Sequence, residues 1–252
     1  MVYRRKNMTI EIALIIVGSL IGIVSLASSI TGIVLTVKYY RYNRRENSLG
    51  LSGIDVARKI LDDNGLEKIK VKRNGSLLFG NSYSHYFKKV RLREFIRHKK
   101  SITSMGIGAQ KAALAILDKE GDPDMKKRIR LVPLVTFGPF AFIPLALVGV
   151  AIDFFFFTGS GYFTIALGSL GFLFYVYSII LSVLTLKTEK KAQNRAYEIL
   201  KKDYNVKGEE LKALKEVFRL YNIQYVNDII LSSLELIYTV LKIAYEINDK
   251  KN

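Results

Sequence analysis

The sequence predicts a mainly α-helical membrane protein, with four transmembrane helices and a cytoplasmic α+β region made of helices and a small β-sheet. Half of the 252 residues are hydrophobic although 24% are charged, so apolar and charged residues must be segregated along the chain. Three uncharged runs are long enough to cross a bilayer, which takes about 20 helical residues. The absence of cysteine excludes disulfides and thiolate metal sites, and two histidines leave little imidazole chemistry.

The uncharged runs predict the first three spans. Residues 12–37 form an anchor that is too long for a cleaved signal peptide. Residues 131–152 and 154–186 are separated by little more than Asp153 and a Gly-Ser-Gly break, which predicts a helical hairpin. The predicted segments are an N-terminal anchor (1–37), a cytoplasmic α+β domain (38–130), a transmembrane hairpin (131–186), a cytoplasmic helical segment (187–224) and a C-terminal membrane helix (225–252).

The C-terminal helix is interrupted by Asp228, Glu235 and Lys242, which recur every seven residues and share one stripe of a helix. We expect the residues of this stripe to pair within the helix and with neighbouring helices. The alternatives are an ion or proton path along the stripe, or an amphipathic helix that lies in the membrane interface.

The basic residues predict the orientation in a cell membrane. Residues 38–130 carry 23 Lys and Arg and residues 187–224 carry 10, which by the positive-inside rule places both segments in the cytoplasm and both termini outside. A basic N-terminus at residues 4–6 opposes this orientation. Cations that flank spans predict contact with anionic lipids. They are not interleaved with stacking aromatic residues on one face, so we expect no nucleic-acid partner.

Local signals predict the elements of the cytoplasmic domain. Ser52 and Asp55 have the spacing of a capping box at a helix start, and Asn64-Gly65 is typical of a helix end. Residues 69–72 alternate as a strand does, Asn74-Gly75 predicts a hairpin turn with a return over 77–79, and a third strand is expected near 90–92. A helix over 101–118, rich in Gly and Ala, predicts close packing on all sides.

This layout resembles the YugP-type neutral zinc metallopeptidases, which are integral membrane proteins. The best local match is Gly-Leu-Ser-Gly-Ile-Asp-Val-Ala-Arg-Lys-Ile-Leu-Asp-Asp-Asn-Gly-Leu at residues 50–66, and the order of elements matches over about residues 50–240. The resemblance implies a gluzincin-like fold. It also implies a His-Glu-x-x-His helix whose histidines hold zinc while the glutamate acts as general base, with a third ligand from a glutamate on the helix after the hairpin.

At the corresponding positions this chain reads Gln110-Lys111-Ala112-Ala113-Leu114, so both histidines and the catalytic glutamate are replaced. Glu189 stands at the position of the third ligand. A lone carboxylate cannot hold catalytic zinc, and a protonated lysine has no lone pair to offer. The resemblance therefore implies a degenerate site at Gln110, Lys111, Leu114 and Glu189, with no catalytic residue, no metal ligand and no cofactor.

We expect Lys111 or Gln110 to contact Glu189, because a buried carboxylate without a partner is costly. The alternative is a solvated Glu189 on a charged loop. His85 is expected in a surface turn and His98 among solvated cations.

The expected function is that of a catalytically inactive homologue that acts as a scaffold or interaction subunit, with other membrane proteins or a second copy as partner. One alternative is an active membrane metallopeptidase with a rearranged site that includes His85 and Glu189. The other is a small transporter or channel subunit, for which the stripe on the last helix is the only indication.

Overall fold

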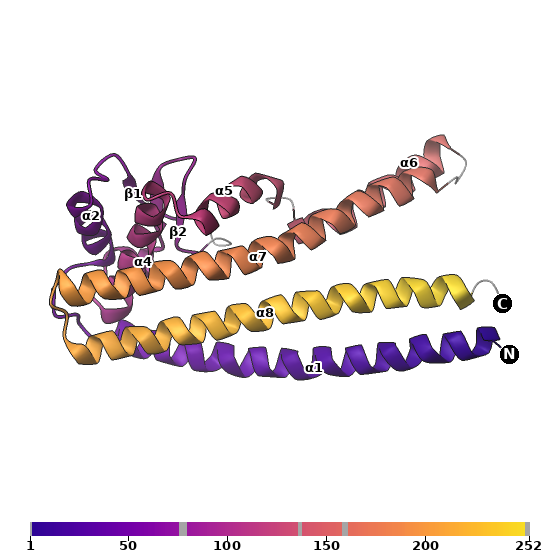
Figure 1. The fold of residues 1–252 in the computed structure, drawn as a ribbon, viewed down its shortest axis with the longest axis horizontal. Coiled ribbons are helices and arrows are strands. Elements are labelled where there is room, and N and C mark those ends of the chain that lie inside the picture. Colours follow the sequence, from indigo (N-terminus) through magenta and orange to yellow (C-terminus); the bar gives the residue numbers. More distant parts are fainter. Residues whose placement is uncertain (1, 76–79, 136–137, 158–160, 250–252) are drawn as a thin grey trace. The chain divides into compact units, whose positions relative to one another are not determined.

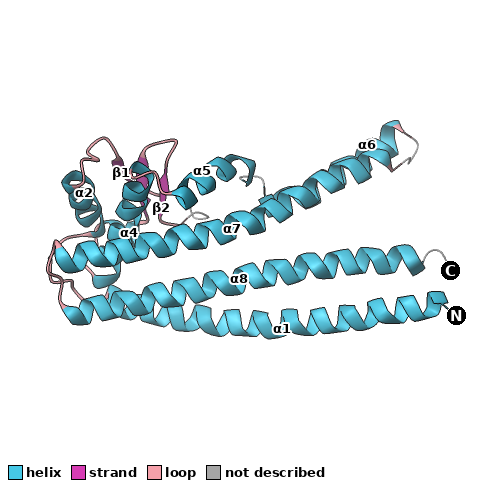
Figure 2. Cartoon of the chain, viewed as in Figure 1, coloured by secondary structure: helices cyan, strands magenta, loops and turns pink. Residues whose placement is uncertain are grey.

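The computed structural model describes residues 2–75, 80–135, 138–157 and 161–249, and it is mainly helical with one small sheet (Figures 1 and 2). The predicted mainly α class with a small sheet is confirmed. The elements are α1 (Val2–Asn43), α2 (Gly53–Asp63), β1 (Lys70–Arg73), β2 (Ser82–Ser84), β3 (Lys89–Leu92), α3 (Glu94–Arg97), α4 (Ile102–Lys119), α5 (Pro123–Val135), α6 (Gly138–Phe156), α7 (Tyr162–Lys202) and α8 (Gly208–Asp249).

The chain divides into two compact units, one of Met1–Tyr39 with Val217–Asn252 and one of Tyr40–Glu216. In the first unit, α1 and α8 lie side by side and antiparallel, with both termini at the same end (Figure 1). Their polar residues join the two helices: Gln224 Nε2 donates to Ser28 Oγ at 2.6 Å, and Tyr245 OH donates to Glu11 Oε1 at 2.9 Å.

The centre of the second unit is α4, in which every residue from Ile102 to Leu117 is buried. Its glycines allow close approach of neighbouring segments. A Cβ on Gly108 would collide with the carbonyl oxygen of Gly53 in α2, and one on Gly106 would collide with a methyl group of Leu214. The close packing predicted for this helix from its Gly and Ala content is therefore confirmed.

The caps predicted around α2 are also confirmed. The Ser52 hydroxyl accepts a hydrogen bond from the backbone of Asp55, and the Asp55 carboxylate accepts one from the backbone of Ser52 at 3.2 Å. Asn64 is the C-cap, and Gly65 follows it with a φ of +65°, a left-handed conformation that glycine adopts without steric cost.

The sheet has the strand order β1-β3-β2, with β1 parallel and β2 antiparallel to β3. Among the described strands, β1 is therefore paired with β3 and not with β2, which follows it in the chain. The return strand predicted over 77–79 lies outside the described residues. Tyr83, Val90 and Leu92 are buried, and β2 and β3 both contact α4, so one face of the sheet packs against the central helix.

α6 and α7 form a hairpin that is held by Asp153, a buried residue of α6. Its carboxylate accepts hydrogen bonds from the backbone nitrogens of Phe163 at 3.1 Å and Thr164 at 2.7 Å, and from the Thr164 hydroxyl at 2.7 Å. These nitrogens lie in the first turn of α7, where helix N–H groups have no partner within the helix. Asp153 therefore caps α7 from the neighbouring helix.

The prediction of four transmembrane helices is wrong for the described part of the chain, in which two helices, Thr9–Asn43 and Tyr162–Lys202, are long and apolar enough to cross a membrane. The second predicted span is divided between α5 and α6, and the apolar helix described there, Pro144–Phe156, is shorter. In α8 the charged residues Asp228, Glu235 and Lys242 interrupt the apolar part of the helix at intervals of seven, so its uncharged stretches stay short.

Candidate functional site

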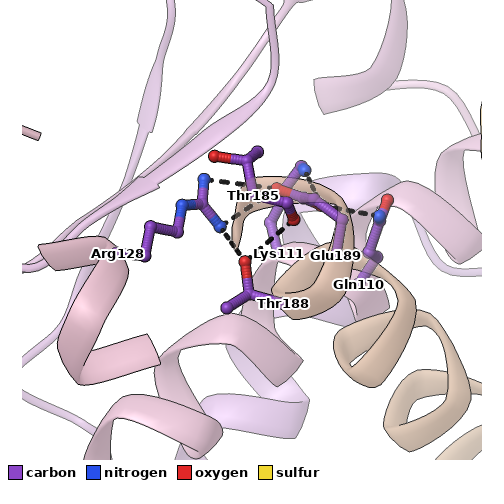
Figure 3. Close-up of polar contacts among 6 residues, drawn as sticks. All are labelled: Gln110, Lys111, Arg128, Thr185, Thr188 and Glu189. Atoms are coloured by element: carbon purple, nitrogen blue, oxygen red, sulfur yellow. Dashed lines mark hydrogen bonds and ion pairs between the residues drawn. The ribbon is translucent and has the colours of Figure 1, made fainter. Parts of the chain in front are cut away.

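Three helices of the second unit bring a set of charged and polar side chains together around Glu189 of α7 (Figure 3). Glu189 Oε2 accepts hydrogen bonds from Lys111 Nζ and Gln110 Nε2 of α4, both at 2.8 Å. Its other oxygen, Oε1, lies 3.4 Å from both terminal nitrogens of Arg128 of α5. We call these four residues, with Thr188, the Glu189 cluster.

The contact expected between Glu189 and Gln110 or Lys111 is present, and both residues make it. The Lys111 and Glu189 side chains are only 10% and 12% exposed, so the alternative of a solvated Glu189 is wrong. Leu114, one turn further along α4, is fully buried and offers only apolar atoms.

Arg128 was not predicted as a member of the site. It is oriented by α7: its Nη1 donates to Thr188 Oγ1 at 2.9 Å, and Thr188 Oγ1 donates in turn to the carbonyl oxygen of Thr185 at 2.9 Å. A second contact ties the start of α5 to α7, because Lys191 Nζ lies 2.6 Å from Asp122 Oδ2 and 2.8 Å from Asp124 Oδ2.

The charges of the cluster keep Glu189 ionised. Glu189 lies beyond the uncharged part of α7, which ends at Leu186. Burial by itself would raise the pKa of Glu189, but the positive charges of Lys111 and Arg128 and their hydrogen bonds outweigh burial and hold this pKa below its usual value. The cluster thus has one carboxylate between two cations.

The residues present do not fit a zinc ion. Zinc is bound by lone pairs of thiolate, imidazole or carboxylate, and a catalytic site supplies three such ligands. Lys111, Gln110 and Arg128 all present donors to Glu189, and two of them are cations that repel a metal ion. Among the residues that the structure describes, no three His, Cys, Asp or Glu side chains are grouped so as to hold a metal.

His85 belongs to a different set of residues. Asp118 Oδ2, at the end of α4, accepts a hydrogen bond from Tyr83 OH at 2.6 Å and lies 2.7 Å from His85 Nδ1 and 3.5 Å from Lys88 Nζ. Burial would raise the pKa of Asp118, but the hydrogen bonds from Tyr83 and His85 and the nearby positive charge lower it. Burial and the Asp118 carboxylate together raise the pKa of Tyr83.

No local pattern in the sequence singles out Asp118, because its partners Tyr83 and His85 lie more than 30 residues away. His98, by contrast, is exposed as expected, with Nε2 at 3.6 Å from Glu94. His85 therefore has a carboxylate partner other than Glu189.

The three charged residues of the stripe on α8 have different surroundings in the first unit. Asp228 Oδ1 accepts hydrogen bonds from Gln224 at 2.9 Å and Ser28 of α1 at 3.4 Å, so it takes part in helix pairing. Glu235 and Lys242 are exposed on the surface of α8, and the structure describes no side-chain bond for either.

Comparisons with known proteins agree with the resemblance to the neutral zinc metallopeptidases. The chain matches the family model described as "Putative neutral zinc metallopeptidase" over residues 15–244. It is also similar to the protein named "Putative membrane protease YugP" of Bacillus subtilis (strain 168), with 26% identity over 208 residues that cover 81% of this chain and 85% of that protein. No solved structure gives a significant match.

Proposed function

The chain belongs to the neutral zinc metallopeptidase family, and from this premise we propose that it is a catalytically inactive member that acts as a scaffold or interaction subunit in a membrane. The observation that carries the proposal is the contact between Lys111 and Glu189 at 2.8 Å. In this arrangement an ammonium group, rather than a metal ion, links the helix that resembles the catalytic helix to the helix of the third ligand. The two positions that the resemblance relates to the catalytic base and the third zinc ligand are thus the two residues in contact.

The chemistry of the cluster supports the proposed loss of hydrolysis. A zinc peptidase needs a metal-bound water and a general base beside it. Lys111, Arg128 and Gln110 offer protons to Glu189 and direct no lone pair toward it, so neither a metal nor an activated water is favoured beside this carboxylate. The cluster instead joins α4, α5 and α7 through hydrogen bonds and ion pairs.

A membrane location is supported by the two apolar helices and by the similarity to a membrane protease. Within our proposal, the basic segments 38–130 and 187–224 face the cytoplasm, by the positive-inside rule, and the hairpin of α6 and α7 enters the membrane from that side. The partners we propose are anionic lipids together with other membrane proteins or a second copy of the chain, and no nucleic acid.

The prediction that the Glu189 cluster binds no zinc and cleaves no peptide is tested on the purified protein in detergent. We expect elemental analysis to find less than stoichiometric zinc after exposure to zinc and washing, and unstructured peptides to remain uncleaved with or without a chelator. Glu189→Gln is the matched variant, since it removes the only carboxylate of the cluster. Metal-dependent cleavage by the parent chain that Glu189→Gln abolishes would overturn the proposal.

The scaffold role needs a separate measurement. The affinity-tagged chain, solubilised from its own membranes and measured by native mass spectrometry, is expected to retain a membrane-protein partner or a second copy at a fixed stoichiometry. A chain that is recovered only as a single copy under mild solubilisation, and that is not cross-linked to any protein in intact membranes, would contradict this role.

A further inference from the structure

One face of the sheet carries four cations for which the described residues supply no acidic partner. Lys70 and Lys72 of β1 are in register with Lys89 and Arg91 of β3, so all four side chains leave the face of the sheet opposite to the buried Val90. In the described part of the chain, none of the four belongs to an ion pair. We call Lys70, Lys72, Lys89 and Arg91 the cationic sheet face.

This arrangement is unfavourable unless an anion covers it. Neighbouring strands lie about 4.8 Å apart, and like charges directly opposite each other on a sheet are destabilising. The side chains that β2 adds to this face are Ser82 and Ser84, which are opposite Arg91 and Lys89. They add hydroxyl groups but no negative charge, so the chemistry of the face matches a phosphate-bearing anion.

Exposed aromatic residues adjoin the cationic sheet face at the turn between β2 and β3. Phe87 is 62% exposed, and Lys89 Nζ and Arg91 lie over its ring at 5.5 and 5.6 Å from its centroid. Because cations already cover this ring, it is poorly suited to stack on a nucleic-acid base. Exposed aromatic residues beside lysine and arginine are typical of the membrane–water interface.

Two hydrogen bonds locate this turn where the chain meets the apolar segments. Tyr86 OH donates to the carbonyl oxygen of Ile129 at 2.9 Å, two residues before the uncharged run that begins at Leu131. The adjacent Arg128 donates to Thr188, two residues after the uncharged run of α7 ends at Leu186. The turn therefore lies at the level at which both apolar runs end.

We propose that the cationic sheet face and the β2–β3 turn dock onto the anionic phospholipid headgroups of the membrane that holds α7, with Phe87 at the interface. The occupant is the headgroup phosphate, bound by the four cations. This inference rests on the membrane location and the anionic-lipid contact of the proposed function, but it does not depend on whether the Glu189 cluster hydrolyses peptides, so each of the two can fail while the other holds.

The absence of cysteine allows a clean test in the full-length chain. Ser82→Cys places a single thiol on the cationic sheet face for an environment-sensitive fluorophore, and the protein is reconstituted in nanodiscs of neutral phosphatidylcholine or with added phosphatidylglycerol. We expect a blue-shifted emission and quenching by lipid-attached quenchers that increase with phosphatidylglycerol. Lys89→Glu/Arg91→Glu should abolish this dependence, since each cation near a lipid surface contributes about a fivefold change in binding.

The matched control is Lys201→Glu/Lys207→Glu, which changes the net charge equally. Lys201 lies 15 residues beyond Leu186 on α7, about 22 Å along a helix, so this control should keep the lipid dependence. The proposal is overturned by a probe that stays in water in both lipids, or by a response that is equal in both. It is also overturned if inorganic phosphate, or a single-stranded oligonucleotide, produces the same response in neutral nanodiscs while phosphatidylglycerol does not.

Discussion

Two carboxylates of the second unit, Glu189 and Asp118, are each surrounded by hydrogen-bond donors, but the donors differ in kind. Glu189 is held by an ammonium, a guanidinium and the NH₂ group of an amide, none of which can accept a bond in return. Asp118 is held by a phenol and lies beside an imidazole and an exposed lysine. The imidazole of His85 is therefore paired with a carboxylate other than the one that the resemblance relates to zinc.

The two carboxylates also differ in how far solvent reaches their partners. The partners of Glu189 are mostly buried, whereas His85 and Lys88 are 37% and 56% exposed. Removing a charge from the Glu189 cluster leaves other charges buried, while solvent can replace much of what surrounds Asp118. Substitutions in the two regions should therefore differ in their cost.

The largest effect is expected for Glu189→Ala. This change leaves Lys111 and Arg128 facing each other in a buried site, and loss of one member of a buried ion pair costs about 3–5 kcal/mol. The measurement is the free energy of unfolding in detergent by thermal or denaturant melts. Glu198→Ala, which removes an exposed carboxylate of the same helix, is the control and should leave stability nearly unchanged. Equal effects of the two changes would contradict the buried role of Glu189.

A double substitution sharpens the comparison. Lys111→Met alone should cost about 1–3 kcal/mol, because Arg128 still neutralises Glu189. Lys111→Met/Glu189→Met replaces this pair by apolar side chains and leaves Arg128 as the one charge of the cluster, bonded to Thr188. We expect the double variant to be more stable than the sum of the single losses predicts, with a coupling of about 1–3 kcal/mol. Strict additivity would mean that the two side chains do not interact.

Asp118→Asn should have a smaller effect, of about 1–2 kcal/mol, because Asn can still accept a bond from Tyr83. The effect depends on pH. The pKa of Asp118 is lowered in the folded state, so its stabilising contribution is complete above its ordinary pKa of about 4 and is lost as pH falls through the folded value.

The pH dependence is measured with His85 in place, because its hydrogen bond and charge are among the causes that lower the pKa of Asp118. Two chains are compared, the parent chain and Asp118→Asn. The difference in their free energies of unfolding should decrease as the pH falls below about 4. A difference that grows on acidification would have the wrong sign for a lowered pKa.

What the sequence predicted well was carried by local signals. Ser52 and Asp55 are three residues apart, and their capping box requires only that spacing. The Gly and Ala content of α4 is also a local signal. It predicted burial because small side chains let neighbouring segments approach a helix closely. The contact between Lys111 and Glu189 followed from the resemblance together with the cost of burying a charge without a partner.

What the sequence did not predict depends on distant contacts. Arg128 belongs to a run with Lys126, Lys127 and Arg130, which are exposed, and nothing local marks the one cation that turns toward α7. The parallel pairing of β1 with β3 is also non-local, whereas Asn74-Gly75 is a local signal that favours a hairpin. The prediction of four spans failed at the second span because an uncharged run does not reveal that its residues are divided between α5 and α6, and at the last span because charged residues interrupt α8.

The smallest effect is expected for Lys191→Ala, at the edge of the same three-helix contact. Lys191 bonds Asp122 and Asp124 at 2.6 and 2.8 Å, shorter than the distance from Arg128 to Glu189, yet its side chain is 41% exposed. Solvent screens such a pair, so we expect a loss below about 1 kcal/mol that disappears in high salt. The effect of Glu189→Ala should persist in the same salt, because burial rather than bond length decides how much each ion pair contributes. If both losses respond equally to salt, the Glu189 cluster is hydrated and its difference from an exposed ion pair is lost.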